Sequence, residues 1–198
     1  MPIDVKTIKR LKELTGVGIT DAKKALEETK GDFDKALEAM RVKGLAKADK
    51  KRERTTKAGL IESYVHDGRI GVLVEVNCET DFVARTDDFK ELAHDLAIHI
   101  AASAPRFISS QNVNEEELEK ERHLIKEELK NSGKPENMLD KIVEGKINKF
   151  YSEVCLLNQP FVKNPDQTVE DRLKEAIARL GENIIVSQMA YLELGASN

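Results

Sequence analysis

The chain is poor in aromatic residues and in cysteine. Its 198 residues include no tryptophan, and aromatic side chains make up only 5% of the total. Proteins that bind single-stranded nucleic acids usually stack the bases on aromatic rings, so this composition gives little support for that mode of binding. The two cysteines, Cys78 and Cys155, lack the C-x-x-C or Cys/His spacing of a metal site. We therefore expect two buried free thiols in a reducing compartment rather than a disulfide framework.

Long apolar segments are also missing. No stretch of the sequence approaches the roughly 20 apolar residues that a membrane-spanning helix requires. The N-terminus carries no apolar segment typical of a secretory signal. The sequence therefore predicts a cytoplasmic protein that has no membrane partner.

The sequence motifs of the common catalytic sites are absent. The chain has no G-x-S-x-G nucleophile turn, no G-x-x-x-x-G-K-[ST] phosphate loop and no G-x-G-x-x-G dinucleotide turn. Glu91, Asp95 and His99 have the i, i+4, i+8 spacing that could place three metal ligands on one helix face. A solvated helix flank explains this stripe equally well, and no H-E-x-x-H pattern supports a metal. We therefore expect a protein that is not an enzyme and binds no metal or cofactor.

Charge is abundant and unevenly distributed. Charged residues make up 34% of the sequence, and the formal net charge is -4. Residues 1–57 contain 16 Lys and Arg against 10 Asp and Glu, whereas residues 58–198 contain 16 basic against 26 acidic residues. A basic N-terminal segment is thus joined to an acidic remainder. Because domains typically contain about 100 to 150 residues, the chain can form one sizeable core and a small additional module.

The N-terminal segment is predicted to form three short helices. The Gly-rich turn at residues 15–18 separates the first two helices, and Thr20 or Asp21 is expected to cap the second. Asp32 is expected to cap the third helix, and Gly44 is expected to end it. Apolar residues at helical spacing on the three segments indicate a small common core.

A charged run at residues 47–57 follows these helices and is typical of a solvated linker. It separates two apolar patterns that are each self-contained. We therefore predict a three-helix domain at residues 1–44, a linker at 45–57 and a core domain at 58–198.

The predicted core domain mixes strands and helices without regular alternation. Asp67-Gly68 is a preferred pair for a type I′ turn and joins two alternating segments into a hairpin. Capping residues precede the predicted helices, and β-branched residues near the C-terminus predict a closing strand. We expect strands at residues 60–66 and 70–76, a helix at 86–103 and a further helix that begins at Asn114. Gly133-Lys134-Pro135 is expected to separate that helix from one that runs to about Tyr151. A helix at 168–181 and a strand at 184–194 complete the expected elements. This antiparallel arrangement predicts an α+β fold.

The segment N-C-E-T-D-F-V-A-R at residues 77–85 lies where an apolar strand gives way to an amphipathic helix. Phe82 precedes Phe89 by seven residues and is in phase with the apolar face of that helix, so it could belong to the core. Thr86, however, is followed by two carboxylates and is a better helix start. That start leaves Asp81 and Phe82 on a connection, where binding residues concentrate. The residues alone leave both interpretations open.

Four segments spread along the chain carry a family resemblance. They are T-G-V-G-I-T-D-A-K-K-A-L (15–26), N-C-E-T-D-F-V-A-R (77–85), L-L-N-Q-P-F-V (156–162) and G-E-N-I-I-V (181–186). Together they resemble bacterial elongation factor Ts, the guanine-nucleotide exchange factor of elongation factor Tu. The resemblance implies a three-helix module like a ubiquitin-associated domain, then a three-stranded antiparallel sheet flanked by helices. The chain is similar to the short form of the family, which lacks the long protruding coiled coil and tends to act as a homodimer.

The resemblance also implies a partner-binding segment. In the family, the Asp-Phe pair that matches Asp81 and Phe82 enters the G domain of elongation factor Tu close to its phosphate loop and Mg²⁺ site. We therefore expect Thr80, Asp81, Phe82 and Val83 to contact elongation factor Tu, both GDP-bound and nucleotide-free, and to promote GDP release.

A second contact is implied for the N-terminal module, which docks on the partner's G domain in the family. From their spacing around the Gly turn we assign this contact to Val17, Gly18, Ile19 and Lys23. For Val17 and Ile19 the residues leave another interpretation open, because apolar side chains in a short turn often close a helical core.

Two other functions remain as alternatives. A ubiquitin-associated-like adaptor would bind helices or peptides without affecting nucleotide exchange, and its binding would be insensitive to GDP. An RNA-binding translation accessory protein would use the basic N-terminal segment. The low aromatic content and the acidic remainder argue against it, so we expect no direct nucleic-acid partner.

Overall fold

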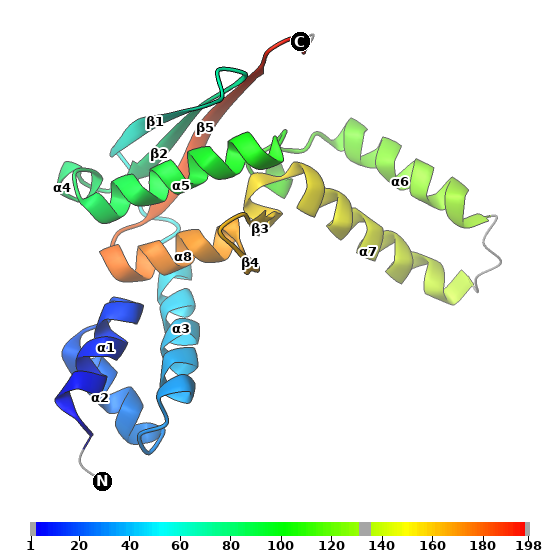
Figure 1. Ribbon diagram of the computed structural model, residues 1–198. Helices are drawn as coiled ribbons and strands as arrows, with labels where there is room; N and C mark the ends of the chain where they lie inside the picture. Colours follow the sequence, from blue (N-terminus) through cyan, green and yellow to red (C-terminus); the bar gives the residue numbers. More distant parts are fainter. Residues whose placement is uncertain (1–2, 131–135, 197–198) are drawn as a thin grey trace.

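The computed structural model describes residues 3–130 and 136–196. Figure 1 shows an N-terminal helical module, a central body built around a sheet, and a pair of helices that projects from the body. The elements are α1 (Val5–Thr15), α2 (Ile19–Glu28), α3 (Phe33–Asp49), β1 (Ala58–His66), β2 (Ile70–Cys78), α4 (Asp81–Ala84), α5 (Asp87–Ser103), η1 (Ser110–Asn112), α6 (Glu115–Lys130), α7 (Glu136–Val154), η2 (Leu156–Asn158), β3 (Pro160–Phe161), β4 (Asn164–Thr168), α8 (Val169–Leu180) and β5 (Ile184–Glu193). The predicted α+β fold is confirmed.

Helices α1, α2 and α3 form the N-terminal module around a small apolar core. The buried residues of this core are Ile8, Leu11, Ala22, Ala25, Leu26, Ala36 and Met40. Asp32 caps α3 as predicted, because its carboxylate accepts a hydrogen bond from a first-turn backbone N–H at 3.1 Å. The predicted caps of α2 are wrong, since Gly18 occupies the N-cap position and Thr20 is already helical. Glycine is accepted at an N-cap, and the earlier start puts the Asp21 carboxylate in the first turn.

Helix α3 runs past its predicted end at Gly44 and continues to Asp49. A Cβ atom on Gly44 would lie 3.2 Å from the Cβ atom of Ala178 on α8, so the absent side chain allows close packing of the two helices. Farther along, Ala48 is completely buried in the core of the body. The first part of the predicted linker at 45–57 is therefore a packed helix, because its small and apolar residues find a surface on α8 that the local sequence does not reveal.

A three-stranded antiparallel sheet in the order β1-β2-β5 forms the centre of the body. Asp67 and Gly68 join β1 to β2 with φ angles of 49° and 65°, the left-handed values that a type I′ turn requires. Strand β5 pairs with β2, which confirms the predicted closing strand. Alternate residues of β2, namely Val72, Val74, Val76 and Cys78, are buried on one face of the sheet.

Helix α5 packs across this buried face, and α8 packs against α5 and β5 (Figure 1). The predicted ends of both helices are confirmed. The Thr86 hydroxyl accepts a hydrogen bond from the backbone N–H of Phe89, Thr168 forms a capping box with Asp171, and Gly181 ends α8 with a φ angle of 85°. Among residues 3–130 and 136–196, no helix combines the length and the apolar character that crossing a bilayer would require.

Helices α6 and α7 lie side by side and project away from the body (Figure 1). Asn114 begins α6 as predicted, because its side chain accepts a hydrogen bond from the backbone N–H of Glu117 at 2.7 Å. The two helices contain 16 and 19 residues and bury a small core of their own, which includes Ile125, Leu129 and Ile147. The resemblance implied that the long protruding coiled coil of the family is absent, whereas this shorter pair of helices does project from the body. The predicted break at Gly133-Lys134-Pro135 lies outside the described residues.

Candidate functional site

The predicted partner-binding segment includes a single-turn helix at one end of the body. Helix α4 covers Asp81–Ala84 and lies between the end of β2 and the start of α5. A helix of one turn has too few hydrogen bonds to be stable alone, so its position depends on the contacts of the residues around it. These surrounding contacts therefore determine where the exposed side chains of α4 lie.

Phe82 is 80% exposed, a larger fraction than for any other large hydrophobic side chain in the described residues. Its interpretation as a core residue is therefore wrong. The chain leaves the helical conformation between α4 and α5, so the seven-residue spacing to the fully buried Phe89 does not place both rings on one helix face. One exposed phenylalanine is common on protein surfaces and does not by itself define a site.

The other residues of α4 divide into a solvent side and a body side. Asp81 forms an exposed ion pair with Arg85 at 2.8 Å, a type of contact that contributes little to stability. Val83 packs against the main core, and Ala84 is 8% exposed. Helix α4 thus rests on the body through Val83 and Ala84 and exposes Asp81 and Phe82.

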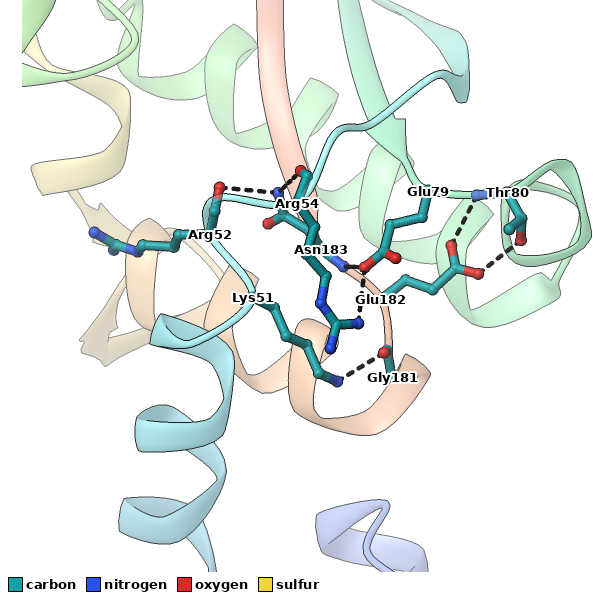
Figure 2. Close-up of polar contacts among 8 residues, drawn as sticks. All are labelled: Lys51, Arg52, Arg54, Glu79, Thr80, Gly181, Glu182 and Asn183. Carbon is teal, nitrogen blue, oxygen red and sulfur yellow. Dashed lines mark hydrogen bonds and ion pairs between the residues drawn. The ribbon is translucent and has the colours of Figure 1, made fainter.

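Thr80 connects α4 to the turn between α8 and β5 (Figure 2). Its backbone N–H donates to Glu182 Oε2 at 3.0 Å, and its hydroxyl donates to Glu182 Oε1 at 2.6 Å. Although Thr80 occupies the N-cap position of α4, its hydroxyl makes no capping bond there. Sequence reasoning did not find this contact. The G-E-N-I-I-V match contained Glu182 but carried no indication of its role.

The four predicted contact residues of the N-terminal module lie at the start of α2. Val17 is partly buried and packs against the core of the module, whereas Ile19 is 52% exposed. A Cβ atom on Gly18 would meet no atom within 4 Å, and Lys23 is exposed in an ion pair with Glu27 at 3.7 Å. Of these two apolar residues, Val17 therefore closes the core of the N-terminal module. Figure 1 places α2 in the module and α4 at the end of the body, so the two predicted surfaces belong to separate parts of the molecule.

Of the two acidic residues in the stripe Glu91, Asp95 and His99, Glu91 is exposed but Asp95 is buried rather than solvated. Asp95 is 4% exposed, its carboxylate pairs with Lys163, and one of its oxygens lies 3.8 Å from Arg172 Nη2. The explanation of the stripe as a solvated flank is thus wrong for Asp95, because two cations distant in the sequence cover it. Within the described residues, no group of three or more potential ligands could hold a metal ion.

His99 of the same stripe is completely buried. Its Nδ1 atom accepts a hydrogen bond from the backbone N–H of Val162 at 3.1 Å, and its Nε2 atom lies 2.9 Å from Gln159 Oε1. A neutral ring protonated at Nε2 satisfies both contacts. Burial lowers the pKa of His99, because the charged ring would lose its hydration. His99 therefore joins α5 to the segment around β3 and is not a metal ligand.

Cys78 and Cys155 are buried free thiols, as predicted. Burial raises the pKa of the Cys155 thiol to about 11 and also raises the pKa of Cys78. The Cys78 thiol donates a hydrogen bond to the backbone carbonyl of Thr80 at 3.1 Å. Both thiols are protonated at neutral pH and poorly placed for redox chemistry.

Comparison with known proteins adds a family to this geometry. The family model described as "Elongation factor TS" matches residues 4–196. The chain is 52% identical over 194 residues to elongation factor Ts of Carboxydothermus hydrogenoformans, which covers 98% of this chain and 89% of that relative. It is 52% identical over 196 residues to the protein of the same name from Fervidobacterium nodosum (98% of this chain and 100% of the relative). With elongation factor Ts of Herpetosiphon aurantiacus it shares 50% identity over 198 residues and the full length of both chains. The chain therefore belongs to the elongation factor Ts family of translation elongation factors.

Proposed function

We propose that this chain is a cytoplasmic guanine-nucleotide exchange factor that binds GDP-bound elongation factor Tu and promotes release of the GDP. The observation that carries the proposal is the exposure of Phe82 within the segment N-C-E-T-D-F-V-A-R, in a chain that belongs to the elongation factor Ts family. Exposed aromatic side chains are frequent anchors of protein interfaces, because they bury a large apolar area on binding.

The proposed mechanism acts on the phosphates and the metal of the bound nucleotide. In phosphate-loop GTPases the β-phosphate is held by backbone N–H groups, a lysine and a Mg²⁺ ion that requires near-ideal octahedral geometry. A small displacement of these groups removes much of the nucleotide-binding energy. Phe82 supplies the wedge that enters an apolar pocket of the partner. Asp81 either adds negative charge close to the metal site or holds α4 through its backbone, whose carbonyl accepts a hydrogen bond from Arg85 N–H at 3.2 Å.

Exchange by displacement has a thermodynamic consequence. A factor that weakens GDP binding must itself be weakened by GDP to the same degree, since coupling between two binding sites is reciprocal. The proposed complex is therefore tight when elongation factor Tu holds no nucleotide, and GTP or GDP releases the factor.

The N-terminal module is proposed to supply a second contact with the same partner. The exposed side chains of Ile19 and Lys23 support this role, and the open space around Gly18 allows close approach of another backbone. Val17 contributes indirectly because it fixes the turn against the core of the module.

The chain is also proposed to form a homodimer through the face of the sheet that α5 leaves uncovered. Apolar residues from all three strands are exposed there: Ile61 (68%), Val65 (66%), Leu73 (51%), Ile185 (40%) and Leu192 (64%). The register places them on one face, because Gly71, two residues before Leu73 in β2, pairs with Val65 on one side and with Leu192 on the other. A second copy of this face would cover them and exclude water.

The release of labelled GDP from elongation factor Tu tests the proposal. Substoichiometric amounts of the chain are expected to accelerate release many-fold and to turn over. A chain that binds elongation factor Tu equally well with and without GDP, and does not change the release rate, would instead fit an adaptor. Salt-dependent binding to RNA without any effect on GDP release would favour the accessory-protein alternative.

A further inference from the structure

Three chain segments that are far apart in the sequence meet beside α4 (Figure 2). They are the segment after α3 (51–54), the connection between β2 and α4 (79–80), and the turn between α8 and β5 (181–183). Polar contacts join all three segments. None of these contacts involves Phe82 itself, although the connection between β2 and α4 leads directly into the helix that carries it.

The second and third segments exchange hydrogen bonds through a reciprocal pair of carboxylates. Glu79 Oε1 accepts a hydrogen bond from the backbone N–H of Asn183 at 2.7 Å. In return, both oxygens of Glu182 accept hydrogen bonds from Thr80, at 3.0 Å from its backbone N–H and at 2.6 Å from its hydroxyl. We call Glu79, Thr80, Glu182 and Asn183 the clasp. Hydrogen bonds to ionised acceptors are stronger than those between neutral groups, so the clasp holds the two turns together firmly.

Asn183 extends the clasp to the first segment. It is 2% exposed, and its Nδ2 atom donates to the backbone carbonyls of Arg52 and Arg54 at 3.2 and 2.8 Å. Lys51 Nζ donates to the carbonyl of Gly181 at 2.7 Å (Figure 2). The chain that leaves α3 is therefore fixed against the same turn that holds Thr80.

The position of α4 depends on its two ends and on one packed side. At its C-terminal end, the Thr86 hydroxyl donates to the carbonyl of Val83 at 2.8 Å. On its packed side, Val83 and Ala84 touch the body. At its N-terminal end the Thr80 carbonyl accepts a hydrogen bond from Ala84 N–H at 3.3 Å, but the Thr80 side chain makes no capping bond to α4. The hydroxyl and the backbone N–H of Thr80 are engaged by Glu182 instead. Without Glu182, the residue that begins α4 would lose both of these bonds at once.

We propose that Glu182 is a positioning residue for nucleotide exchange, which acts by fixing Thr80 so that α4 presents Phe82 in one orientation. This inference rests on the proposed exchange function. Glu182 need not touch the partner or the nucleotide. Its effect is to remove alternative positions of α4 before binding, so that less conformational freedom is lost when Phe82 enters its pocket.

The test compares three replacements in the full chain. Glu182→Ala removes both acceptor oxygens, whereas Glu182→Gln keeps one of them and the shape of the side chain. Glu62→Ala is the matched control, because Glu62 is a half-buried carboxylate of the body that contacts His94 on α5 at 3.1 Å and does not contact Thr80. The accelerated GDP release is expected to fall about tenfold in Glu182→Ala, as two charge-assisted bonds are lost. It is expected to fall by less in Glu182→Gln and to stay near the parent value in Glu62→Ala.

A combination with Phe82→Ala separates positioning from a general loss of structure. If Glu182 acts through Phe82, adding Glu182→Ala to Phe82→Ala is expected to change release by less than about twofold, because coupled residues are not additive. If Glu182→Ala lowers GDP release by the same factor in the Phe82→Ala variant as in the parent chain, the inference is overturned.

Amide hydrogen exchange provides a readout that does not depend on GDP release. The backbone N–H groups of Ala84 and Arg85 donate to the carbonyls of Thr80 and Asp81 at 3.3 and 3.2 Å. They are expected to exchange faster in Glu182→Ala and at the parent rate in Glu62→Ala. If the amide hydrogens of Ala84 and Arg85 exchange at the parent rate in Glu182→Ala, the positioning role is overturned, whatever the GDP-release assay shows. A parent chain that fails to accelerate GDP release overturns the proposed function. A parent that accelerates release no more than Glu182→Ala does overturns only the role of Glu182.

Discussion

Replacing Phe82 by alanine separates a binding residue from a structural one. The side chain is 80% exposed, so only about one fifth of it is protected from water in the free protein. A phenylalanine that is fully buried removes about 150 to 250 Å² from water, and the protected part of Phe82 is therefore about 40 Å². At about 25 cal/mol per Å², this area contributes about 1 kcal/mol to the free energy of unfolding.

Phe89→Ala is the matched comparison, because Phe89 is the same residue type, lies seven positions later and is completely buried. Truncation of a buried phenylalanine typically costs about 3 to 5 kcal/mol. For a chain of this size, about 1 kcal/mol lowers the melting temperature by about 2 to 4 °C. Phe82→Ala is therefore expected to melt within a few degrees of the parent, whereas Phe89→Ala is expected to melt well below it.

The nucleotide-exchange activity of Phe82→Ala is expected to fall strongly, although its melting temperature changes little. Loss of a central aromatic anchor typically costs about 2 kcal/mol or more, which corresponds to a fall of about thirtyfold in accelerated GDP release for Phe82→Ala. Circular dichroism melts and stopped-flow release of labelled GDP measure the two quantities on the same samples. Two results would refute the reasoning: a large drop in the melting temperature of Phe82→Ala, or a normal melting curve with full exchange activity.

The remaining predictions concern domain boundaries, assembly and pH. A chain that lacks residues 1–57 is expected to melt below one that lacks only 1–44, because it also loses Ala48 from the core; equal melting temperatures in circular dichroism would contradict this. Leu73→Asp is expected to convert the proposed dimer into a monomer in sedimentation experiments at micromolar concentration, while reductant leaves the parent dimer intact; a variant that stays dimeric would exclude this face. Burial lowers the pKa of His99 in the folded state, so below about pH 6.5 the unfolded chain binds a proton that the folded chain does not, and stability falls as the pH falls. Urea titrations between pH 7 and pH 5 are expected to show a shallower loss of stability in His99→Gln, and identical slopes would argue against a buried neutral ring.

Local signals in the sequence predicted most of the fold. Asp67-Gly68 determined the hairpin, Thr86 and Thr168 marked helix starts, and Gly181 marked a helix end, because each signal acts within a few residues of its own position. The predictions that were wrong concern residues whose contacts lie far away in the sequence. Gly44 does not end α3, since its lack of a side chain is used for contact with a helix more than a hundred residues later.

The polar residues on α5 show the same limit. Spacing placed Asp95 and His99 on one stripe, but only the tertiary structure brings Lys163 and Gln159 to them and explains their burial. Spacing also allowed Phe82 a place in the core, and this was wrong because a break in the helix cannot be read from periodicity. Physical reasoning from residues left the site undecided, whereas the family resemblance indicated the partner and the segment.

Because α3 runs without a break from the N-terminal module into the body, it affects how two partner contacts together determine the affinity of the chain. The proposed partner contacts lie on the N-terminal module and on α4, and a flexible tether between them would let the module sample many positions after the first contact forms. Such a tether dilutes the second contact to a finite effective concentration. A helix that runs from the module into the core of the body, with Ala48 completely buried near its end, restricts that sampling instead. The module can then be a weak binder by itself and still add strongly to affinity, provided that a partner presents both complementary surfaces at the one separation that α3 imposes.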